Sequence, residues 1–105
     1  MTRALERLRR KLTVENLWMY VIAVLAEKPT YPYDVRRRIE ERFSFKPATI
    51  TVYTVMYRME REGLIAKRSD GTYEVTEKGL ATLREAIVLL QDTARMLSSS
   101  IAEPP

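Results

Sequence analysis

The amino-acid sequence predicts a mainly α-helical fold with one small two-stranded hairpin. Apolar residues recur at the helical period of 3.6 residues over most of the chain, in segments 3–12, 13–27, 33–43, 49–62 and 77–99. One strong turn signal, Asp70-Gly71, separates two short extended runs. At 105 residues, the chain is expected to form one domain with a modest core.

The composition argues against several classes of function. The chain has no cysteine and no histidine, so Ser-His-Asp and Cys-His catalytic arrangements and the usual zinc sites cannot form. No pair of carboxylates lies in an apolar setting that would raise a pKa, so we expect no enzyme, no cofactor and no metal site. No apolar run is long enough to span a bilayer and no signal peptide is visible, so we expect a cytoplasmic protein without a membrane partner.

The first helix is expected over residues 3–12, where the positive charge gathers. Residues 1–12 hold five cations and one acid, which accounts for the net charge of +4, and the remainder is balanced. Such a basic segment favours an anionic polymer as partner, although a solvated basic helix fits equally well. Thr2 is placed to cap this helix, and Leu5, Leu8 and Leu12 form its apolar face.

A second helix is expected from Thr13 to about Glu27. It is apolar almost all round, which is typical of a helix buried on more than one side. Trp18 and Tyr20 widen the apolar surface and are the candidate lining of a small-molecule effector pocket. For Trp18, a position at a subunit interface and simple packing in the core are the alternatives.

A third helix is expected from Tyr33 to about Phe43, with Pro32 at its first position. Val35 and Ile39 are expected to face inward, and the outward face is rich in arginine and glutamate. In a helix-turn-helix the first helix crosses the phosphate backbone, and these arginines would serve there. Some of the charges are also spaced to pair with one another.

The chain is organised around the stretch Thr49–Ile65. Its apolar residues fall at i, i+3, i+4 and i+7, and Gly63 provides a left-handed helix end. The β-branched residues of the first half favour a strand by propensity, but the helical period outweighs them. The opposite face carries hydroxyl, aromatic and guanidinium groups, which suits phosphates and base edges; an ordinary solvated face is the alternative. The inward residues are Val52, Val55, Met56 and Met59.

A hairpin is expected next, with a two-residue turn at Asp70-Gly71. Its tip would present Lys67, Arg68, Ser69 and Thr72. Three helices followed by a hairpin is the order of a winged helix-turn-helix, in which a three-helix core carries a two-stranded wing.

The last helix, 77–99, is capped by Thr76 and carries an apolar heptad seam. A compact core cannot use so long a seam, so a homodimer is the simplest interpretation; folding back onto its own domain is the alternative. We therefore divide the chain into a DNA-binding domain with the basic N-terminal helix (1–76), a dimerisation helix (77–99) and a flexible tail (100–105). The seam consists of Leu80, Leu83, Ile87, Leu90, Ala94, Leu97 and Ile101.

Residues 17–97 resemble the PadR-type transcriptional regulators. Four segments carry the resemblance: the helix end Val24–Pro29, the element Pro32–Val35, the tyrosine-bearing helix Tyr53–Ile65 with its Glu-Gly-Leu-Ile end, and the wing end Tyr73–Gly79. The resemblance implies a winged helix-turn-helix that dimerises through its N-terminal and C-terminal helices. It also implies repression of transcription from a palindromic operator.

The sequence departs from the family pattern at two positions near the expected DNA-facing side. Pro32 stands where the family has glycine, and Thr54 stands where a proline usually follows the helix tyrosine. The operator sequence is therefore not carried over from the family. Many members sense small molecules, but the last helix here has no aromatic residue, which argues against an effector pocket between such helices.

The expected function is that of a sequence-specific regulator, a repressor, that binds double-stranded DNA as a homodimer. The alternative is a winged-helix module that binds protein. The pair Tyr53 and Tyr57, one helical turn apart, leaves that interpretation open. The expected base-reading residues are Thr49, Thr51, Tyr53, Thr54, Tyr57 and Arg58. The expected contacts to the DNA backbone are Tyr33, Arg36, Arg37, Lys46, Arg61, Lys67 and Arg68. The expected dimer interface consists of Leu5, Leu8, Leu80, Leu83, Ile87, Leu90, Ala94 and Leu97.

Overall fold

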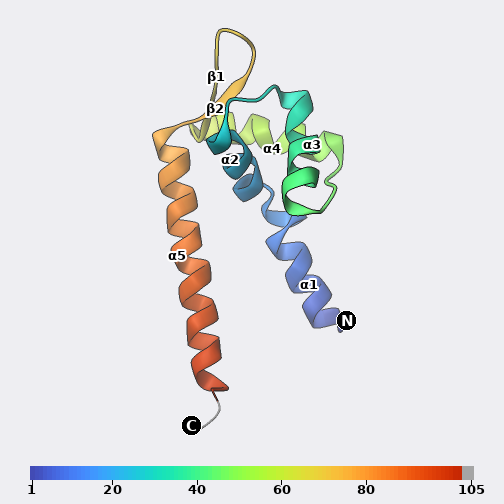
Figure 1. Ribbon diagram of the computed structural model, residues 1–105, viewed down its shortest axis with the longest axis vertical. Coiled ribbons are helices and arrows are strands. Elements are labelled where there is room, and N and C mark those ends of the chain that lie inside the picture. The colour runs from blue at the N-terminus through green and yellow to red at the C-terminus, as the bar shows by residue number, and fades with distance from the viewer. Residues whose placement is uncertain (103–105) are drawn as a thin grey trace.

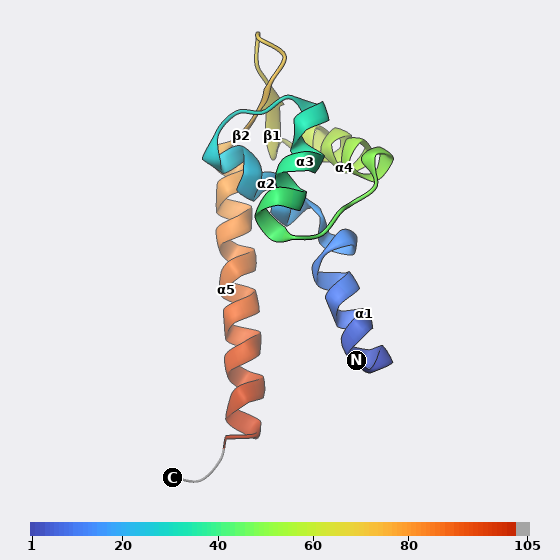
Figure 2. The same ribbon diagram turned by 45° about the vertical axis from the view of Figure 1, so that its right-hand side comes forward.

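The computed structural model describes residues 1–102 and shows a helical body from which two helical arms extend. Figures 1 and 2 show α2, α3, α4 and the hairpin gathered in the body, while α1 and α5 both run away from the hairpin. We call α1 and α5 the arms. In chain order the elements are α1 (Arg3–Leu12), the 3-10 turn η1 (Val14–Asn16), α2 (Trp18–Glu27), α3 (Pro32–Phe43), α4 (Thr49–Glu62), β1 (Ile65–Lys67), β2 (Tyr73–Val75) and α5 (Glu77–Ser100).

The hydrophobic core lies where α2, α3, α4 and the base of the hairpin meet. The central core residues expose no more than 3% of their surface, and they come from all of these elements. α2 supplies the most, because it packs against α3, α4, α5 and β2. The fold is therefore a winged helix-turn-helix, as predicted. The central residues are Val21, Ile22, Val24, Leu25, Val35, Ile39, Val52, Met56, Met59 and Ile65.

The predicted helix ends are confirmed at several places. The Thr2 side chain accepts a hydrogen bond from the Leu5 amide at 3.2 Å. Pro32 occupies the first turn of α3. Gly63 ends α4 with a φ of 79°, the left-handed conformation that glycine adopts most readily. The β-branched start of α4 is helical, because burial of its apolar side outweighs its local preference for strand.

The prediction of one continuous helix over 13–27 was wrong. Thr13 leaves helical geometry, with φ −116° and ψ −96°, and α2 begins only at Trp18. The Thr13 hydroxyl donates to the Arg9 carbonyl at 2.7 Å, and the Asn16 amide donates to the Lys11 carbonyl at 2.6 Å. These bonds satisfy carbonyls that the end of α1 leaves free, so α1 ends at this point and the chain turns.

The turn of the hairpin also differs from the prediction. Arg68 and Thr72 close it through the Arg68 amide and the Thr72 carbonyl at 2.8 Å, so the loop has three residues rather than two. Gly71 takes a φ of 88°, which suits a tight turn followed by a glycine bulge. Thr72 is buried and is not presented at the tip, because its hydroxyl is bonded to the Asp70 carboxylate at 2.6 Å.

The root of α5 is fastened to the end of α4. The Thr76 hydroxyl donates to the Gly63 carbonyl at 2.6 Å, and the Lys78 ammonium donates to the Glu62 carbonyl at 2.7 Å. A Cβ at Gly79 would lie only 2.2 Å from the Leu64 carbonyl oxygen, so any side chain there would collide with backbone. The direction in which α5 leaves the body is therefore set by close backbone contact.

The described helix α5 continues to Ser100. Of the tail predicted over residues 100–105, residues 103–105 lie outside the described residues. Within residues 1–102, the structure contains no helix with the length and apolar character needed to cross a bilayer.

Candidate nucleic-acid interface

The outward side of α4 forms a line of exposed side chains opposite its buried side. Ile50, Thr54, Tyr57 and Arg61 follow one another at i, i+4, i+7 and i+11, which places them on a single face of the helix. The Thr54 hydroxyl donates to the Ile50 carbonyl at 2.9 Å. The Arg61 guanidinium lies 5.7 Å from the centroid of the Tyr57 ring, within the range of a cation–π contact.

The residues predicted to read bases are not all equally placed. Most of them are exposed, but Thr51 is half-buried at the side of the helix. Arg58 lines a cavity beside Trp18, on the flank of α4. The exposed members are Thr49, Tyr53, Thr54, Tyr57 and Arg58.

A hollow of about 210 Å³ joins α4 to the start of α3 and to the hairpin. The Tyr73 hydroxyl at its edge donates to Glu60 at 3.0 Å. Burial and then this carboxylate raise the pKa of Tyr73 above its ordinary value. The hollow makes the exposed side of α4 continuous with the hairpin, so one surface spans three elements. Its lining residues are Pro32, Tyr53, Met56, Tyr57, Glu60 and Tyr73.

Two stacked tyrosines support the hairpin loop. The rings of Tyr31 and Tyr33 lie 5.3 Å apart and nearly parallel. Tyr31 also reaches the loop, since a Cβ at Gly71 would lie 3.4 Å from its ring. Thr30 pairs with Tyr73 through two backbone hydrogen bonds of 3.1 and 2.9 Å. The start of α3 and the hairpin are thus joined by backbone and by aromatic contact, and Tyr33, predicted to touch DNA backbone, lies in this support.

The cations predicted to hold phosphates fall into two groups. Among residues 1–102, no carboxylate forms an ion pair with Lys46, Arg61 or Lys67. Arg36, Arg37 and Arg68 are all paired within the chain.

The most strongly paired of these is Arg37, which bonds Asp34 at 2.9 Å and Glu41 at 3.1 Å. The hydrogen bond to Asp34 is the main cause, and the bond to Glu41 the second, of a raised pKa of Arg37. The other two pairings are longer: Arg36 to Glu40 at 3.7 Å, and Arg68 to Glu74 at 3.6 Å and to Asp70 at 3.9 Å.

One ion-pair cluster was not foreseen from the sequence. Glu27, at the end of α2, accepts from Arg38 at 2.9 Å and from Arg42 at 3.1 Å, and Arg38 also donates to the Thr30 hydroxyl at 2.5 Å. The partners are 8 to 15 residues apart in sequence, so local spacing carries no signal of it. These two arginines therefore tie α3 to the end of α2.

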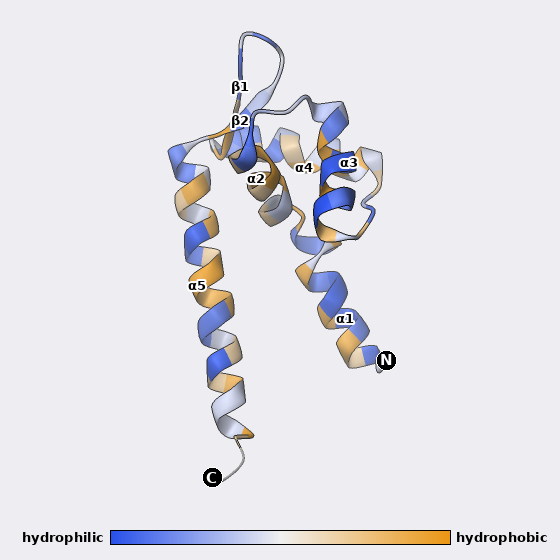
Figure 3. Cartoon of the chain, viewed as in Figure 1, coloured by the Kyte–Doolittle hydropathy of each residue, from blue (hydrophilic) through white to orange (hydrophobic). Residues whose placement is uncertain are grey.

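The arms differ from the body in the character of their exposed residues. Figure 3 shows hydrophobic bands along α5 and on α1, while α3 is strongly hydrophilic. On α5, Leu80 and Leu83 lie partly against the body, but Ile87 and Leu90 are each 42% exposed and Leu97 is 66% exposed. Ala94 is exposed as well. On α1, Leu5 and Leu8 are exposed.

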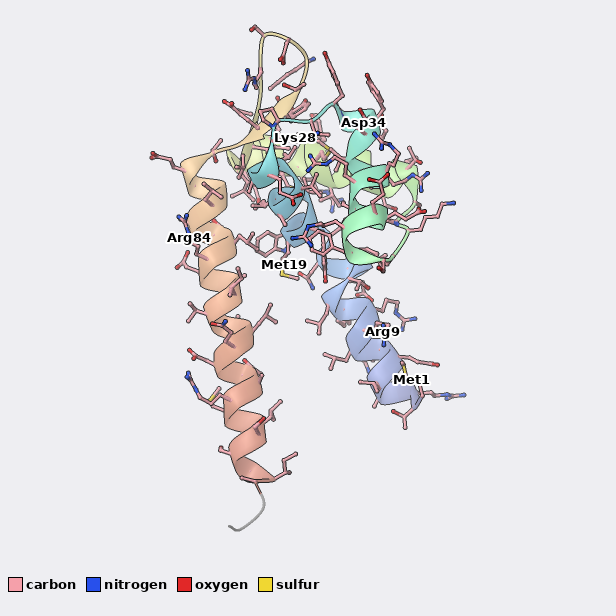
Figure 4. All side chains as sticks on the ribbon, in the orientation of Figure 1. Met1, Arg9, Met19, Lys28, Asp34 and Arg84 are labelled. Carbon is pink, nitrogen blue, oxygen red and sulfur yellow. The ribbon has the colours of Figure 1, made fainter. Side chains whose placement is uncertain are left out.

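The cations of α1 lie on an arm and not beside the hairpin. Figure 4 shows Arg9 on α1, far from Lys28 and Asp34, which lie toward the hairpin. At the base of α1, Glu15 pairs with Lys11 at 2.6 Å and with Arg10 at 3.4 Å. The hydrogen bond from Lys11 is the main cause of the lowered pKa of Glu15.

The two residues suggested for an effector pocket lie in different environments. Trp18 lines a cavity of about 370 Å³ between α2, α4 and α5, together with Val55 and Met59. Tyr20 does not line that cavity: its hydroxyl donates to the Leu12 carbonyl at 2.5 Å, and its ring packs edge-on against Phe43 and Phe45. Burial raises the pKa of Tyr20.

Within the described residues, no group of three or more His, Cys, Asp or Glu side chains is arranged to hold a metal ion. The site is instead a surface of tyrosines, hydroxyls and unpaired cations on α4, the start of α3 and the hairpin.

Comparison with known proteins agrees with this fold. The family profile described as "Transcriptional regulator PadR-like family" matches residues 21–85. Among curated proteins, no sequence matches the chain.

Solved structures with the same fold include three described as PadR regulators. One from Bacillus cereus is 20% identical, with 91% of this chain and 99% of that chain covered and a TM-score of 0.66. One from Clostridium difficile is 21% identical, with 81% and 97% covered and a TM-score of 0.67. One from Bacteroides fragilis is 17% identical, with 89% and 97% covered and a TM-score of 0.68.

Proposed function

The chain belongs to the PadR-like family of transcriptional regulators, and we propose that this DNA-binding regulator is a repressor that acts as a homodimer on a palindromic operator. One observation carries the proposal. The molecule separates two kinds of exposed surface. Hydroxyls, tyrosines and cations without an ion pair lie around α4 and the hairpin, whereas the exposed leucines and isoleucines, apart from Ile50, lie along the arms. The first surface suits DNA and the second suits another copy of the chain.

The proposed DNA contacts begin with α4 in the major groove. Thr49, Tyr53, Thr54 and Tyr57 would meet base edges, with Thr51 and Arg58 at the sides of the helix. Lys46, Arg61 and Lys67 would bind phosphates directly, because no carboxylate of the described chain competes for them. Arg36, Arg37 and Arg68 would first have to share or break their ion pairs with carboxylates of the chain. The cost is small, because an exposed ion pair contributes only about 0 to 1 kcal/mol to stability. Tyr33 would contact the backbone beside the hairpin.

The proposed dimer forms through the arms. The exposed seam of α5 and the leucines of α1 are apolar surfaces on helices that project beyond the body, so burying them against a second copy removes them from water. In this division residues 1–76 carry the DNA-binding surface, with α1 also contributing to the dimer interface, and residues 77–99 form the dimerisation helix. A two-fold dimer presents two α4 helices in opposite directions, which calls for inverted half-sites.

The cavity beside Trp18 is the proposed effector site. It lies against both α4 and the start of α5, so a ligand there would touch the DNA-binding helix and an arm at once. Trp18 is the single tryptophan of the chain, so tryptophan emission comes from a residue that lines this cavity. A panel of aromatic and hydrophobic compounds that leaves this fluorescence and the thermal midpoint unchanged would count against the site.

The decisive experiment measures binding of the full chain to its own upstream DNA and to random duplex by fluorescence anisotropy, from low to physiological salt. The proposal requires a steep loss of affinity with salt and a tighter complex with the upstream DNA. Footprints on inverted half-sites and reduced expression of a reporter gene would support the palindrome and repression. Failure to bind any duplex at low salt would contradict the proposal. It would favour a winged-helix module that binds protein, for which the tyrosine-lined hollow would be the contact.

A further inference from the structure

We propose that Ile50 reads the C5-methyl group of a thymine, so that each half-site of the operator carries thymine opposite the start of α4. The inference rests on the proposed function and names the base group that the α4 surface recognises. Ile50 is the second residue of α4, is 76% exposed and begins the outward line of the helix.

The start of α4 lacks the side chains that usually discriminate bases through paired hydrogen bonds. Residues 49–57 contain no arginine, lysine, asparagine, glutamine, aspartate or glutamate. Bidentate contacts from arginine to guanine or from asparagine to adenine are therefore absent from this part of the helix. What remains to discriminate bases is a set of hydroxyl, aromatic and methyl groups.

Thr54 contributes to the apolar character of this line. It follows Ile50 by one helical turn, and its hydroxyl donates to the Ile50 carbonyl at 2.9 Å. The proton of the hydroxyl is therefore used within the helix and is not free for a base. Its methyl group adds to the apolar surface of Ile50.

The position of Ile50 has no explanation in the packing or the helix propensity of the described chain. The side chain is largely exposed, and a β-branched residue is a poorer helix former than most alternatives. Single exposed apolar residues are common on proteins, but this one occupies the N-terminal part of the helix that enters the groove. In the major groove, the thymine methyl is the apolar group that base edges display. Ile50 and thymine therefore match in chemistry and in place.

The test uses the full chain and a duplex selected by it from random sequences. Each thymine of the selected site is replaced in turn by deoxyuridine, which removes only the C5-methyl group. At one or two positions per half-site, we expect deoxyuridine to weaken binding about fourfold, the amount that corresponds to one buried methyl-sized group.

Two variants assign the effect to Ile50. Ile50→Ala should bind the thymine and deoxyuridine duplexes equally, at about the weaker level, because the apolar partner of the methyl group is gone. Ile50→Val keeps two methyl groups and should retain part of the difference. Since Ile50 is exposed, both variants should keep the wild-type thermal midpoint, which shows that the fold is unaffected. Deoxyuridine outside the footprint is the matched control on the DNA.

The outcomes separate the inference from the proposed function. If the wild-type chain shows no specific binding to any selected duplex, both fail. If binding is specific but no deoxyuridine position matters, or if Ile50→Ala keeps the full difference, the regulator stands and the reading of thymine by Ile50 is overturned. Wild-type affinity of Ile50→Ala for the selected duplex would also overturn it.

Discussion

The helices α4 and α5 are both amphipathic, yet the apolar side of α4 is buried whereas most of the apolar side of α5 is exposed. In α4, with 14 residues, Val52, Met56 and Met59 are at most 3% exposed, because α2, α3 and β1 cover them. In α5, with 24 residues, the apolar seam beyond Leu83 is largely exposed. The same sequence periodicity therefore marks one helix that completes a core and one that presents a surface.

The two helices therefore contribute to the free energy of unfolding under different conditions. The apolar side of α4 stabilises the single chain, whereas the exposed part of the α5 seam can contribute only when something else covers it. Side-chain truncations in the two helices should then be visible in different experiments, and the predictions below exploit that.

The largest effect is expected in the core side of α4. Met56→Ala should lower the free energy of unfolding by about 2 to 5 kcal/mol, because it removes a buried side chain and leaves a cavity. Leu97→Ala, at an exposed position of α5, is the comparison and should change unfolding mainly through its dependence on protein concentration. Urea denaturation at several protein concentrations measures both. Equal, concentration-independent losses would remove the distinction between the helices.

A charge in the middle of the α5 seam should break the proposed dimer. Leu90→Glu is expected to give a monomer in light scattering and to weaken operator binding about 100-fold, since two half-sites are no longer bound by one particle. The control is Ser99→Glu, which adds the same charge on the opposite side of the helix and should leave the dimer intact. A Leu90→Glu protein that stays dimeric would exclude this seam as the interface.

On α4, the exposed aromatic side should affect specificity and not stability. Tyr53→Ala is expected to weaken operator binding roughly tenfold while binding to random duplex changes little, because base contacts discriminate and phosphate contacts do not. Tyr53→Phe separates the contribution of the hydroxyl from that of the ring. Equal losses on operator and random DNA would remove Tyr53 from the base-reading set.

Replacing a cation should change the salt dependence of DNA binding by an amount that depends on whether the cation is already in an ion pair. Lys67→Ala is expected to reduce the salt slope of DNA binding by about one unit, because one phosphate contact is lost. Arg37→Ala should change the slope less, since that guanidinium is held by Asp34 and Glu41 in the free protein. Anisotropy titrations between about 50 and 200 mM salt measure the slopes. A larger change for Arg37→Ala would mean that DNA releases this residue from its pairs.

The smallest effect concerns pH and the hairpin loop. The hydroxyl and the amide of Thr72 donate to Asp70 and lower the pKa of that carboxyl. Because the pKa of Asp70 is lower in the folded state, the carboxylate stabilises the fold at pH values above its ordinary pKa of about 3.9. This stability is lost as the pH falls through the pKa of the folded state. The Thr72 amide signal in NMR should therefore stay constant from pH 8 to 5 and shift with a midpoint below about 3.9. A midpoint above that value would contradict the hydrogen-bonded loop.

Much of the fold could be predicted because it depends on local periodicity and on a few end signals. The apolar spacing located α1, α3, α4 and α5 closely, and Thr2, Pro32, Gly63 and Thr76 marked helix ends. For α4 the period had to be preferred over residue propensity, because burial in the core, and not the β-branched residues, decides its conformation.

The remaining features depend on contacts that the sequence pattern does not encode. The break before α2 arises from the side chains of Thr13 and Asn16 reaching back to carbonyls of α1. The three-residue loop of the hairpin depends on Gly71 and on the Arg68–Thr72 pair. For the candidate site, residue types predicted the surface, but the pairing of Arg37 and the position of Arg58 beside Trp18 required the three-dimensional arrangement.

Because Gly79 lies tightly against the Leu64 carbonyl, α5 leaves the body at a point beside the end of α4, which we call the pivot. With 24 residues, the helix is on the order of 36 Å long. A tilt of about 5° at the pivot moves the far end by roughly 3 Å, close to the rise of one base pair. In the proposed dimer, the tight contact at Gly79 would therefore hold the separation of the two half-sites to within about one base pair.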